Sequence, residues 1–157
     1  MKIWFDTEFI DDGATIDLLS IGMVSEDGRL YYAEAKEAIR RRACPWVHQN
    51  VIAKMKGPIL PRAQIAREIV EFAGDKPEFW AWYGAYDWVA LCQLYGSMLD
   101  LPAGWPKYVR DLKQEADRTG IKKMPDHRLP EHHALHDAIW TKEAHAFVGH
   151  VEYVSLV

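Results

Sequence analysis

Runs of bulky apolar residues in the first part of the chain predict three β-strands. The runs lie at residues 3–5 (Ile-Trp-Phe), 17–24 (DLLSIGMV) and 30–35 (LYYAEA), and they are rich in the side chains that strands favour. Residues 25–28 (Ser-Glu-Asp-Gly) separate the second run from the third and are typical of a tight turn. We therefore expect the chain to open with three antiparallel strands.

The remaining pattern predicts helices and one further buried strand. Residues 61–74 carry apolar side chains at roughly helical spacing and end in a glycine, which favours a helix. Residues 79–83 (FWAWY) are typical of a buried strand. Further helices are expected at 45–55, 88–95, 109–119 and 135 to about 151, with loops at 101–106 and 122–130. Because no repeat or linker is visible, we expect one α/β domain over residues 1–157, a mixed sheet flanked by helices.

Composition indicates a globular protein and leaves its partner open. Apolar residues make up 49% of the chain, which argues against disorder. The net charge of −4 counts mildly against a nucleic-acid binder, although acids that bind metal contribute to that total. Basic stretches lie at Arg40–Arg42, Lys54 with Lys56, Lys107 with Arg110, and Lys122 with Lys123. Each is more often a solvated face, but together they are a candidate track for phosphates.

The sequence also bears on the compartment. No apolar run is long enough to span a membrane, and the first residues enter a strand pattern without the apolar core of a signal peptide. Cys44 and Cys92 are isolated and show no paired spacing, as is usual in a reducing cytosol. We therefore expect a cytoplasmic protein without a membrane partner.

Four acidic residues and one histidine are the candidate functional set. Asp6 and Glu8 are two apart on a strand and so point to one face, where like charges cost free energy unless a cation neutralises them. Asp87 follows the buried strand, and Asp137 lies in the last helix. Such acids, gathered by folding, would make a two-metal phosphodiesterase centre. His132 precedes the last helix, and an imidazole, whose ordinary pKa is about 6.5, suits a general base.

Each acid also has an ordinary structural interpretation. The Asp6–Glu8 pair would simply end its strand at a solvated edge, and Asp137 would lie on an exposed helix turn. Asp87 would be a helix N-cap, a common use of Asp, and that interpretation would prevail if the residue stood alone. The N-cap interpretation is weakened because the Asp6 and Glu8 carboxylates need further acidic residues to complete a metal site.

Two other histidines compete with His132 for the proton-transfer role. His133 and His136 lie within the same segment, and His136 followed by Asp137 is similar to the dipeptide of HD-type phosphohydrolases. Those enzymes are all-helical and need further histidine ligands on helices. The strand-rich N-terminal half of this chain argues against them.

Taken in order, these motifs resemble those of the DEDDh exonucleases of the RNase T and oligoribonuclease type, which have an RNase H-like fold. Asp6-Thr7-Glu8 matches the first motif, Asp87 in GAYD the second, and His132 to Asp137 the His-x4-Asp third motif. The segments FDTEF and WAWYGAYDWVALCQL are most similar to those of a small bacterial branch, the polyadenylate-specific 3'-exoribonucleases. One position departs from the family, because many members carry Asn where this chain has Tyr83.

The resemblance implies an enzyme with a defined division of labour. Asp6, Glu8, Asp87 and Asp137 would hold two Mg²⁺ or Mn²⁺ ions, and His132 would accept the proton of the attacking water. Glu8 would also contact the terminal 3'-hydroxyl. By analogy, Phe9 and Ile10 would pack against bases; Trp88, with Trp46, Trp82 and Trp105, is a weaker candidate, since a Trp more often packs in the core.

We therefore expect a metal-dependent 3'-5' exoribonuclease that acts on single-stranded RNA with a free 3' end, with poly(A) tails and 3' overhangs as candidate substrates. The family resemblance also implies a homodimer. The alternatives are a DNA or oligonucleotide exonuclease, a proofreading-type subunit, or a catalytically weak nucleic-acid-binding module on the same fold.

Overall fold

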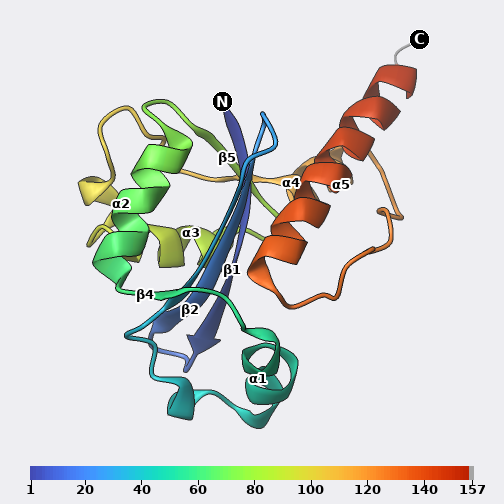
Figure 1. The fold of residues 1–157 in the computed structure, drawn as a ribbon. Coiled ribbons are helices and arrows are strands. Elements are labelled where there is room, and N and C mark those ends of the chain that lie inside the picture. Colours follow the sequence, from blue (N-terminus) through green and yellow to red (C-terminus); the bar gives the residue numbers. More distant parts are fainter. Residues whose placement is uncertain (156–157) are drawn as a thin grey trace.

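A six-stranded mixed sheet forms the centre of the molecule (Figure 1). The computed structural model describes residues 1–155, and side chains through Val151, so the last two residues of the expected domain lie outside this range. The strands follow the order β4-β3-β2-β1-β5-β6 across the sheet. Their bounds are β1 Lys2–Asp11, β2 Ile16–Ser25, β3 Leu30–Ala35, β4 Ile59–Leu60, β5 Glu78–Ala81 and β6 Arg110–Asp111. β1, β2 and β3 are antiparallel, whereas β4, β5 and β6 join as parallel strands, which confirms the predicted α/β class.

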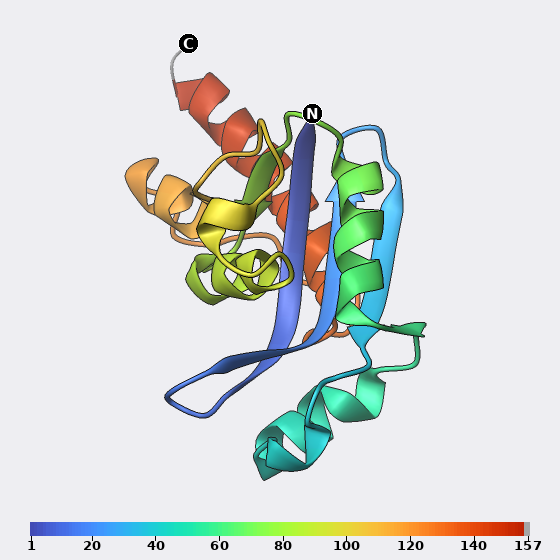
Figure 2. The same cartoon turned by 90° about the vertical axis from the view of Figure 1, so that its left-hand side faces the viewer.

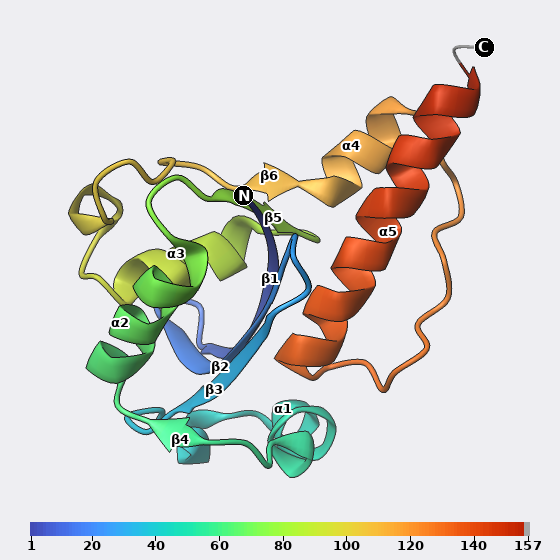
Figure 3. The ribbon, with the colours of Figure 1, turned by 45° about the horizontal axis from the view of Figure 1, so that its top comes forward.

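Helices cover both faces of the sheet. In Figure 1, α2 and α3 lie on one side of the strands and α5 lies on the other. α4 packs against α5 on that second side, as the view in Figure 3 makes clear. The helical bounds are η1 Arg40–Arg42, α1 Pro45–Asn50, η2 Ile52–Lys54, α2 Arg62–Ala73, α3 Ala85–Gln93, η3 Met98–Asp100, α4 Leu112–Arg118 and α5 Ala134–Ser155. Among the described residues, no helix is both long enough and apolar enough to cross a membrane.

Strand alternation sends successive β1 side chains to opposite helical layers. Phe5 is fully buried and meets Phe79 edge-on within the core beneath α2 and α3. Trp4 faces the other layer, where its ring meets His145 of α5 at a centroid distance of 5.3 Å. Because residues two apart in a strand share a face, Asp6 and Glu8 lie on the same side as Trp4, facing α5.

Several boundaries differ from those the sequence predicts. β1 extends much further than expected, because its antiparallel pairing with β2 continues to Asp11 opposite Ile16. β2 matches the expected strand to within one residue at each end. The expected strand at 79–83 ends at Ala81, since Tyr83 adopts a left-handed backbone with φ of 55°. The helix expected from 109 begins at Leu112, where the Asp111 carboxylate accepts a hydrogen bond from the Lys113 amide at 2.8 Å.

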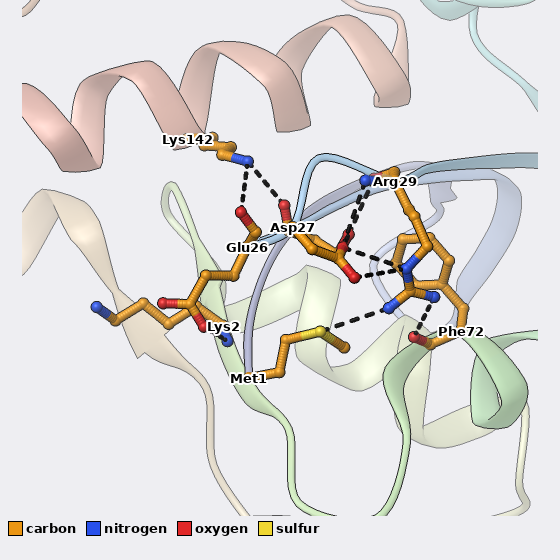
Figure 4. Close-up of polar contacts among 8 residues, drawn as sticks. Met1, Lys2, Glu26, Asp27, Arg29, Phe72 and Lys142 are labelled. Atoms are coloured by element: carbon orange, nitrogen blue, oxygen red, sulfur yellow. Dashed lines mark hydrogen bonds and ion pairs between the residues drawn. The ribbon is translucent and has the colours of Figure 1, made fainter.

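The β2–β3 turn ties the two helical layers together at one end of the sheet (Figure 4). Lys142 of α5 donates from Nζ to the Ser25 carbonyl at 2.7 Å. On the other side, Arg29 pairs with Asp27 at 2.9 Å and donates to the Phe72 carbonyl of α2 at 3.1 Å. These contacts fix α5 relative to β2 and so help to hold the acid that α5 carries.

A separate lobe lies beyond the other end of the sheet, between β3 and β4 (Figure 2). We call residues 38–58, with η1, α1 and η2, the basic lobe. Its small core consists of Ala43 and Val51 packed on Ile10 of β1 and Leu19 of β2. The helix expected at 45–55 is here divided into α1 and η2, with Val51 between them.

Candidate active site

β1 and β5 separate at the point where the acidic motif begins. Their pairing ends at Trp4 and Trp80, so the edge of β1 beyond Trp4 has no strand beside it on that side. The first turn of α3 takes that place and brings Asp87 to β1. Asp87 accepts hydrogen bonds at Oδ1 from the Thr7 amide at 2.8 Å and from the Thr7 hydroxyl at 2.6 Å. A carboxylate therefore satisfies a backbone donor that a continued sheet would have paired.

Asp87 lies within α3 and does not cap its N-terminus. The N-cap position is Gly84, and Asp87 stands in the first helical turn, 5% exposed. Burial raises the pKa of its carboxyl to about 6, while the two hydrogen bonds from Thr7 act in the opposite direction. The N-cap alternative is wrong for this residue, and its burial is consistent with a place in an acidic site.

Asp6 and Glu8 lie on the α5-facing side of β1. Burial, followed by the charges of Asp87, Glu8 and Asp137, raises the pKa of Asp6 well above its ordinary value. Burial and the charges of Asp137 and Asp87 raise the pKa of Glu8 to about 8, against a smaller opposing effect of Lys54. Without a cation, therefore, these carboxylates cannot all ionise at neutral pH without a cost in free energy.

Asp137 organises the entry to α5. Its Oδ2 accepts hydrogen bonds from the His132 amide at 2.8 Å and the His133 amide at 3.2 Å. These bonds fold the chain back at His132, whose φ of 60° is unusual for a residue with a side chain. The other oxygen, Oδ1, is buried and has no hydrogen-bond partner in the described part of the chain; His127 Nδ1 lies 3.6 Å away.

The five predicted residues meet at one open cavity. Its volume is about 310 Å³, and its lining includes Asp6, Glu8, Asp87, His132 and Asp137. Ligand atoms of Glu8, His132 and Asp137 all lie within 4.8 Å of one another. This spacing, the raised carboxyl pKa values and the unpartnered Asp137 oxygen fit a divalent cation, because hard cations prefer carboxylate oxygens.

The structure distinguishes the three neighbouring histidines. His132 lines the cavity, whereas His133 stacks on Tyr32 with ring centroids 4.5 Å apart. His136 stacks on His133 and places Nδ1 3.0 Å from the Pro130 carbonyl oxygen. Of the three, His132 alone among the described residues borders the four acids in that cavity.

The residues expected to contact bases differ in their exposure at the cavity. Phe9 lines the cavity and meets the exposed ring of Tyr86 edge-on, with centroids 5.8 Å apart. Ile10 is 4% exposed in the core of the basic lobe, and Trp88 is 9% exposed in the core beneath α2 and α3. Neither presents a free side-chain surface, so the structure does not support a role in base contacts for Ile10 or Trp88.

Sequence reasoning missed some residues of this cavity. Thr7 was not a candidate, although a buried hydroxyl between two acids on a strand calls for a partner. Tyr86, 52% exposed on the first turn of α3, lines the cavity beside Tyr83. An adjoining cavity of about 220 Å³ includes His127 and Glu131 together with Asp6 and His132. No sequence signal marks His127, since its approach to Asp137 depends on the fold of the loop.

The chain is similar to known proteins over most of its length. Residues 1–148 match the family described as the 3'-5' exoribonuclease Rv2179c-like domain. The chain belongs to this family. Two of its relatives, the 3'-5' exoribonuclease Rv2179c of Mycobacterium tuberculosis strain H37Rv and the 3'-5' exoribonuclease MT2234.1 of strain CDC 1551, are each 45% identical over 146 residues, covering 88% of this chain and 87% of each relative.

Solved structures of another exonuclease have a similar fold. The chain is similar to two structures of exonuclease I, with TM-scores of 0.59 and 0.63 at 11% and 12% identity. Each match covers 99% of this chain but 44% and 43% of exonuclease I, so the chain spans less than half of those proteins. This similarity confirms the predicted RNase H-like fold, and the family implies dependence on a divalent metal.

Proposed function

We propose that this chain is a 3'-5' exoribonuclease that removes nucleotides from the free 3' end of single-stranded RNA. Membership of a 3'-5' exoribonuclease family supports the reaction class. The observation that carries the proposal for this chain is the convergence of Asp6, Glu8, Asp87, His132 and Asp137 at one cavity, from β1, α3 and the entry to α5. This intact set also argues against a binding module that has lost catalysis.

In this proposal the four acids hold two Mg²⁺ or Mn²⁺ ions. When bound, the ions supply Lewis-acid stabilisation of charge on the phosphoryl oxygens. Thr7 holds Asp87 in place through two hydrogen bonds, and the His132 and His133 amides orient Asp137. Asp87 and Asp137 therefore enter the reaction already oriented, which limits the reorganisation required at the transition state.

In this proposal, His132 moves the proton. It accepts the proton of the attacking water at an imidazole nitrogen while the water oxygen bonds to the scissile phosphorus. The bond from phosphorus to the 3'-oxygen breaks, and its electron pair stays on that oxygen, which takes a proton from solvent to become the new 3'-hydroxyl as the terminal nucleoside 5'-monophosphate leaves. The Glu8 carboxylate contacts the terminal 3'-hydroxyl, so an internal phosphodiester, which has no free hydroxyl there, lacks this contact. Phe9 and Tyr86 form an aromatic border against which the terminal base packs.

A digestion of end-labelled RNA tests this function. Incubating 5'-labelled single-stranded RNA with Mg²⁺ or Mn²⁺ should give a ladder of successively shorter products, and Asp6→Asn should abolish it. Asp126→Asn, an exposed acid outside the site, is the matched control and should leave the ladder intact. Absence of products with several RNAs and both metals would contradict the proposal, as would faster digestion of a matched DNA strand.

Two further assignments are proposals at the level of the whole protein. A homodimer is expected from the family resemblance, and its test is the mass of the native protein in solution by light scattering. Residence in the reducing cytoplasm is supported by two free cysteines, of which Cys44 is exposed and Cys92 buried.

A further inference from the structure

The basic lobe concentrates positive charge in an acidic protein. Residues 38–58 contain three arginines, two lysines and no acidic residue, although the chain as a whole has a net charge of −4. Arg41, Arg42 and Lys56 are exposed and form no ion pair within the described residues. Cations gathered in one segment that contains no acidic residue produce a local positive potential, which attracts an anionic ligand.

This lobe borders the active site directly. The ring of Trp46 on α1 meets that of His132 at a centroid distance of 4.9 Å, and Figure 3 shows α1 beside the start of α5. Lys54 on η2 donates from Nζ to the Glu131 carbonyl at 2.5 Å, and its charge also lowers the pKa of Glu8. A ligand on the lobe therefore extends to the edge of the catalytic cavity.

The sheet holds the lobe at both of its ends. Glu34 of β3 is 1% exposed and accepts hydrogen bonds from Arg40 at 3.0 Å and from the Gly57 amide at 2.7 Å. Asp17 of β2 accepts a further bond from the Ile39 amide at 3.0 Å. Because these anchors occupy Arg40 near the base of the lobe, the exposed Arg41, Arg42 and Lys56 remain available on a surface that is already ordered.

An aromatic side chain accompanies this charge. Trp46 is 53% exposed, although it is a large apolar residue on a short helix beside the catalytic histidine. Proteins that bind single-stranded nucleic acid combine a basic surface along the backbone with exposed rings on which bases stack. The basic lobe carries both features, and Trp46 lies beside His132 at the cavity.

We propose that the basic lobe binds the RNA strand upstream of the terminal nucleotide. Arg41, Arg42 and Lys56 contact the phosphodiester backbone, and Trp46 offers its exposed ring to a base near the cavity. The inference rests on the proposed exoribonuclease function and adds where the body of the substrate lies. It predicts that the enzyme distinguishes substrates by length, since a dinucleotide is too short to occupy both the cavity and the lobe.

Steady-state kinetics with two substrates test this inference. The substrates are a diribonucleotide and a single-stranded RNA of about twelve nucleotides, within the range that such grooves accommodate. In the wild-type protein the longer RNA should have the lower KM. The triple variant Arg41→Ala, Arg42→Ala, Lys56→Ala should raise the KM of the longer RNA roughly tenfold and leave kcat/KM for the dinucleotide unchanged.

Salt dependence gives a second readout. Each phosphate contact on a single strand contributes about 0.7 to the slope of log KM against log salt, so the triple variant should lower that slope by roughly 2. The matched control removes three exposed cations outside both the lobe and the candidate phosphate track, Lys36→Ala, Arg67→Ala, Lys76→Ala, and should leave the slope near the wild-type value. This control separates contact with RNA from the change in net charge.

The outcomes distinguish the two proposals. Equal effects of the triple variant on both substrates, or an equal effect of the control, would overturn the assignment of the lobe while leaving the exoribonuclease function in place. Absence of hydrolysis of either RNA by the wild-type protein would instead refute the function itself. Unchanged circular dichroism and unfolding temperature of the triple variant show that its fold is intact.

Discussion

Thr7 gives both of its hydrogen-bond donors to a single oxygen of Asp87, 80 residues away in the sequence. The two residues are 4% and 5% exposed, so water does not replace these bonds readily. This contact joins β1 to α3 where the β1–β5 pairing ends, and it fixes the orientation of one of the four site acids. The acid from α3 thereby belongs to the same rigid unit as Asp6 and Glu8.

Replacing Thr7 by Val should loosen Asp87 while keeping the side chain's shape. Loss of a hydrogen bond to a charged group costs about 1.5–3 kcal/mol, and loss of a residue that orients a metal ligand typically costs about 10–100-fold in metal affinity or activity. We expect lower Mn²⁺ affinity by calorimetry and lower kcat/KM on RNA. Thr15→Val, which removes an exposed hydroxyl bond to Asp12, should change neither.

The metal-free protein should lose stability as the pH rises. Burial and neighbouring acids raise the pKa of Glu8 to about 8 and that of Asp87 to about 6. In the unfolded chain both acids have a pKa of about 4. Between about pH 4 and 8, therefore, the folded state binds more protons than the unfolded state. The free energy of unfolding therefore falls as the pH rises through this window.

Thermal unfolding in a chelator across this pH range measures that effect. The double variant Asp6→Asn, Glu8→Gln should flatten the decline, because it removes two of the repelling charges. Added Mn²⁺ should restore stability to the wild-type protein at high pH but not to this variant. A wild-type melting temperature that rises with pH in the chelator would disprove the expectation.

His132→Ala should reduce kcat with little change in metal binding. A positioned general base contributes about 10²- to 10⁴-fold to rate, and this is the expected loss. Calorimetry with Mn²⁺ is decisive here, because Glu8, His132 and Asp137 have ligand atoms within 4.8 Å of one another. A loss of metal affinity would make His132 a ligand rather than a base. His136→Ala is the control, because it alters a neighbouring imidazole outside the cavity that the four acids line. This variant should remain active.

Gly22 sets how closely α5 approaches the sheet. It lies opposite Asp6 on β2, and a Cβ placed there would come within 2.2 Å of the Leu135 amide nitrogen. Gly22→Ala should therefore displace the first turn of α5, where Asp137 lies, and cost about 1–3 kcal/mol of stability along with activity. Gly149→Ala, later in α5 with open space around it, should be neutral or slightly stabilising. Urea unfolding and RNA digestion of both variants test this contrast.

Tyr83→Asn should stabilise the protein. Tyr83 holds a left-handed φ of 55° while 63% exposed, and that backbone costs roughly 1–2 kcal/mol for most residues but less for Asn. Urea unfolding should show a gain on the order of 1 kcal/mol. Tyr86→Asn on α3, where the backbone is helical, should show no gain.

Local patterns in the sequence predicted which residues converge at the cavity better than they predicted the surroundings of that cavity. Period-2 alternation placed Asp6 and Glu8 on one face, and that holds because β1 remains a regular strand through both residues. The pairing changes register immediately afterwards, between Glu8 and Phe9, and such an irregularity leaves no mark in residue periodicity. Base contacts assigned beyond that point, such as Ile10, were therefore unreliable.

Features that depend on long-range contacts could not be predicted in the same way. β4 and β6 are two residues each, too short for any periodic signal, and they exist because β3 and β5 offer them an edge. Trp88 was an ambiguous aromatic residue in the sequence and proves to be core, because α3 packs it against Phe79. The Thr7–Asp87 contact joins two motifs whose own patterns give no indication of it.

The anchoring of the basic lobe has an evolutionary consequence. The lobe is anchored to the sheet through Glu34 and Asp17 and shares a small core with β1 and β2, whereas the catalytic acids lie on β1, α3 and α5. Mutations on its outer surface can therefore accumulate without disturbing the cleavage chemistry. The inner surface of the lobe is constrained instead, because Trp46 meets the ring of His132 and Lys54 binds the Glu131 carbonyl, so a change there reaches the active site.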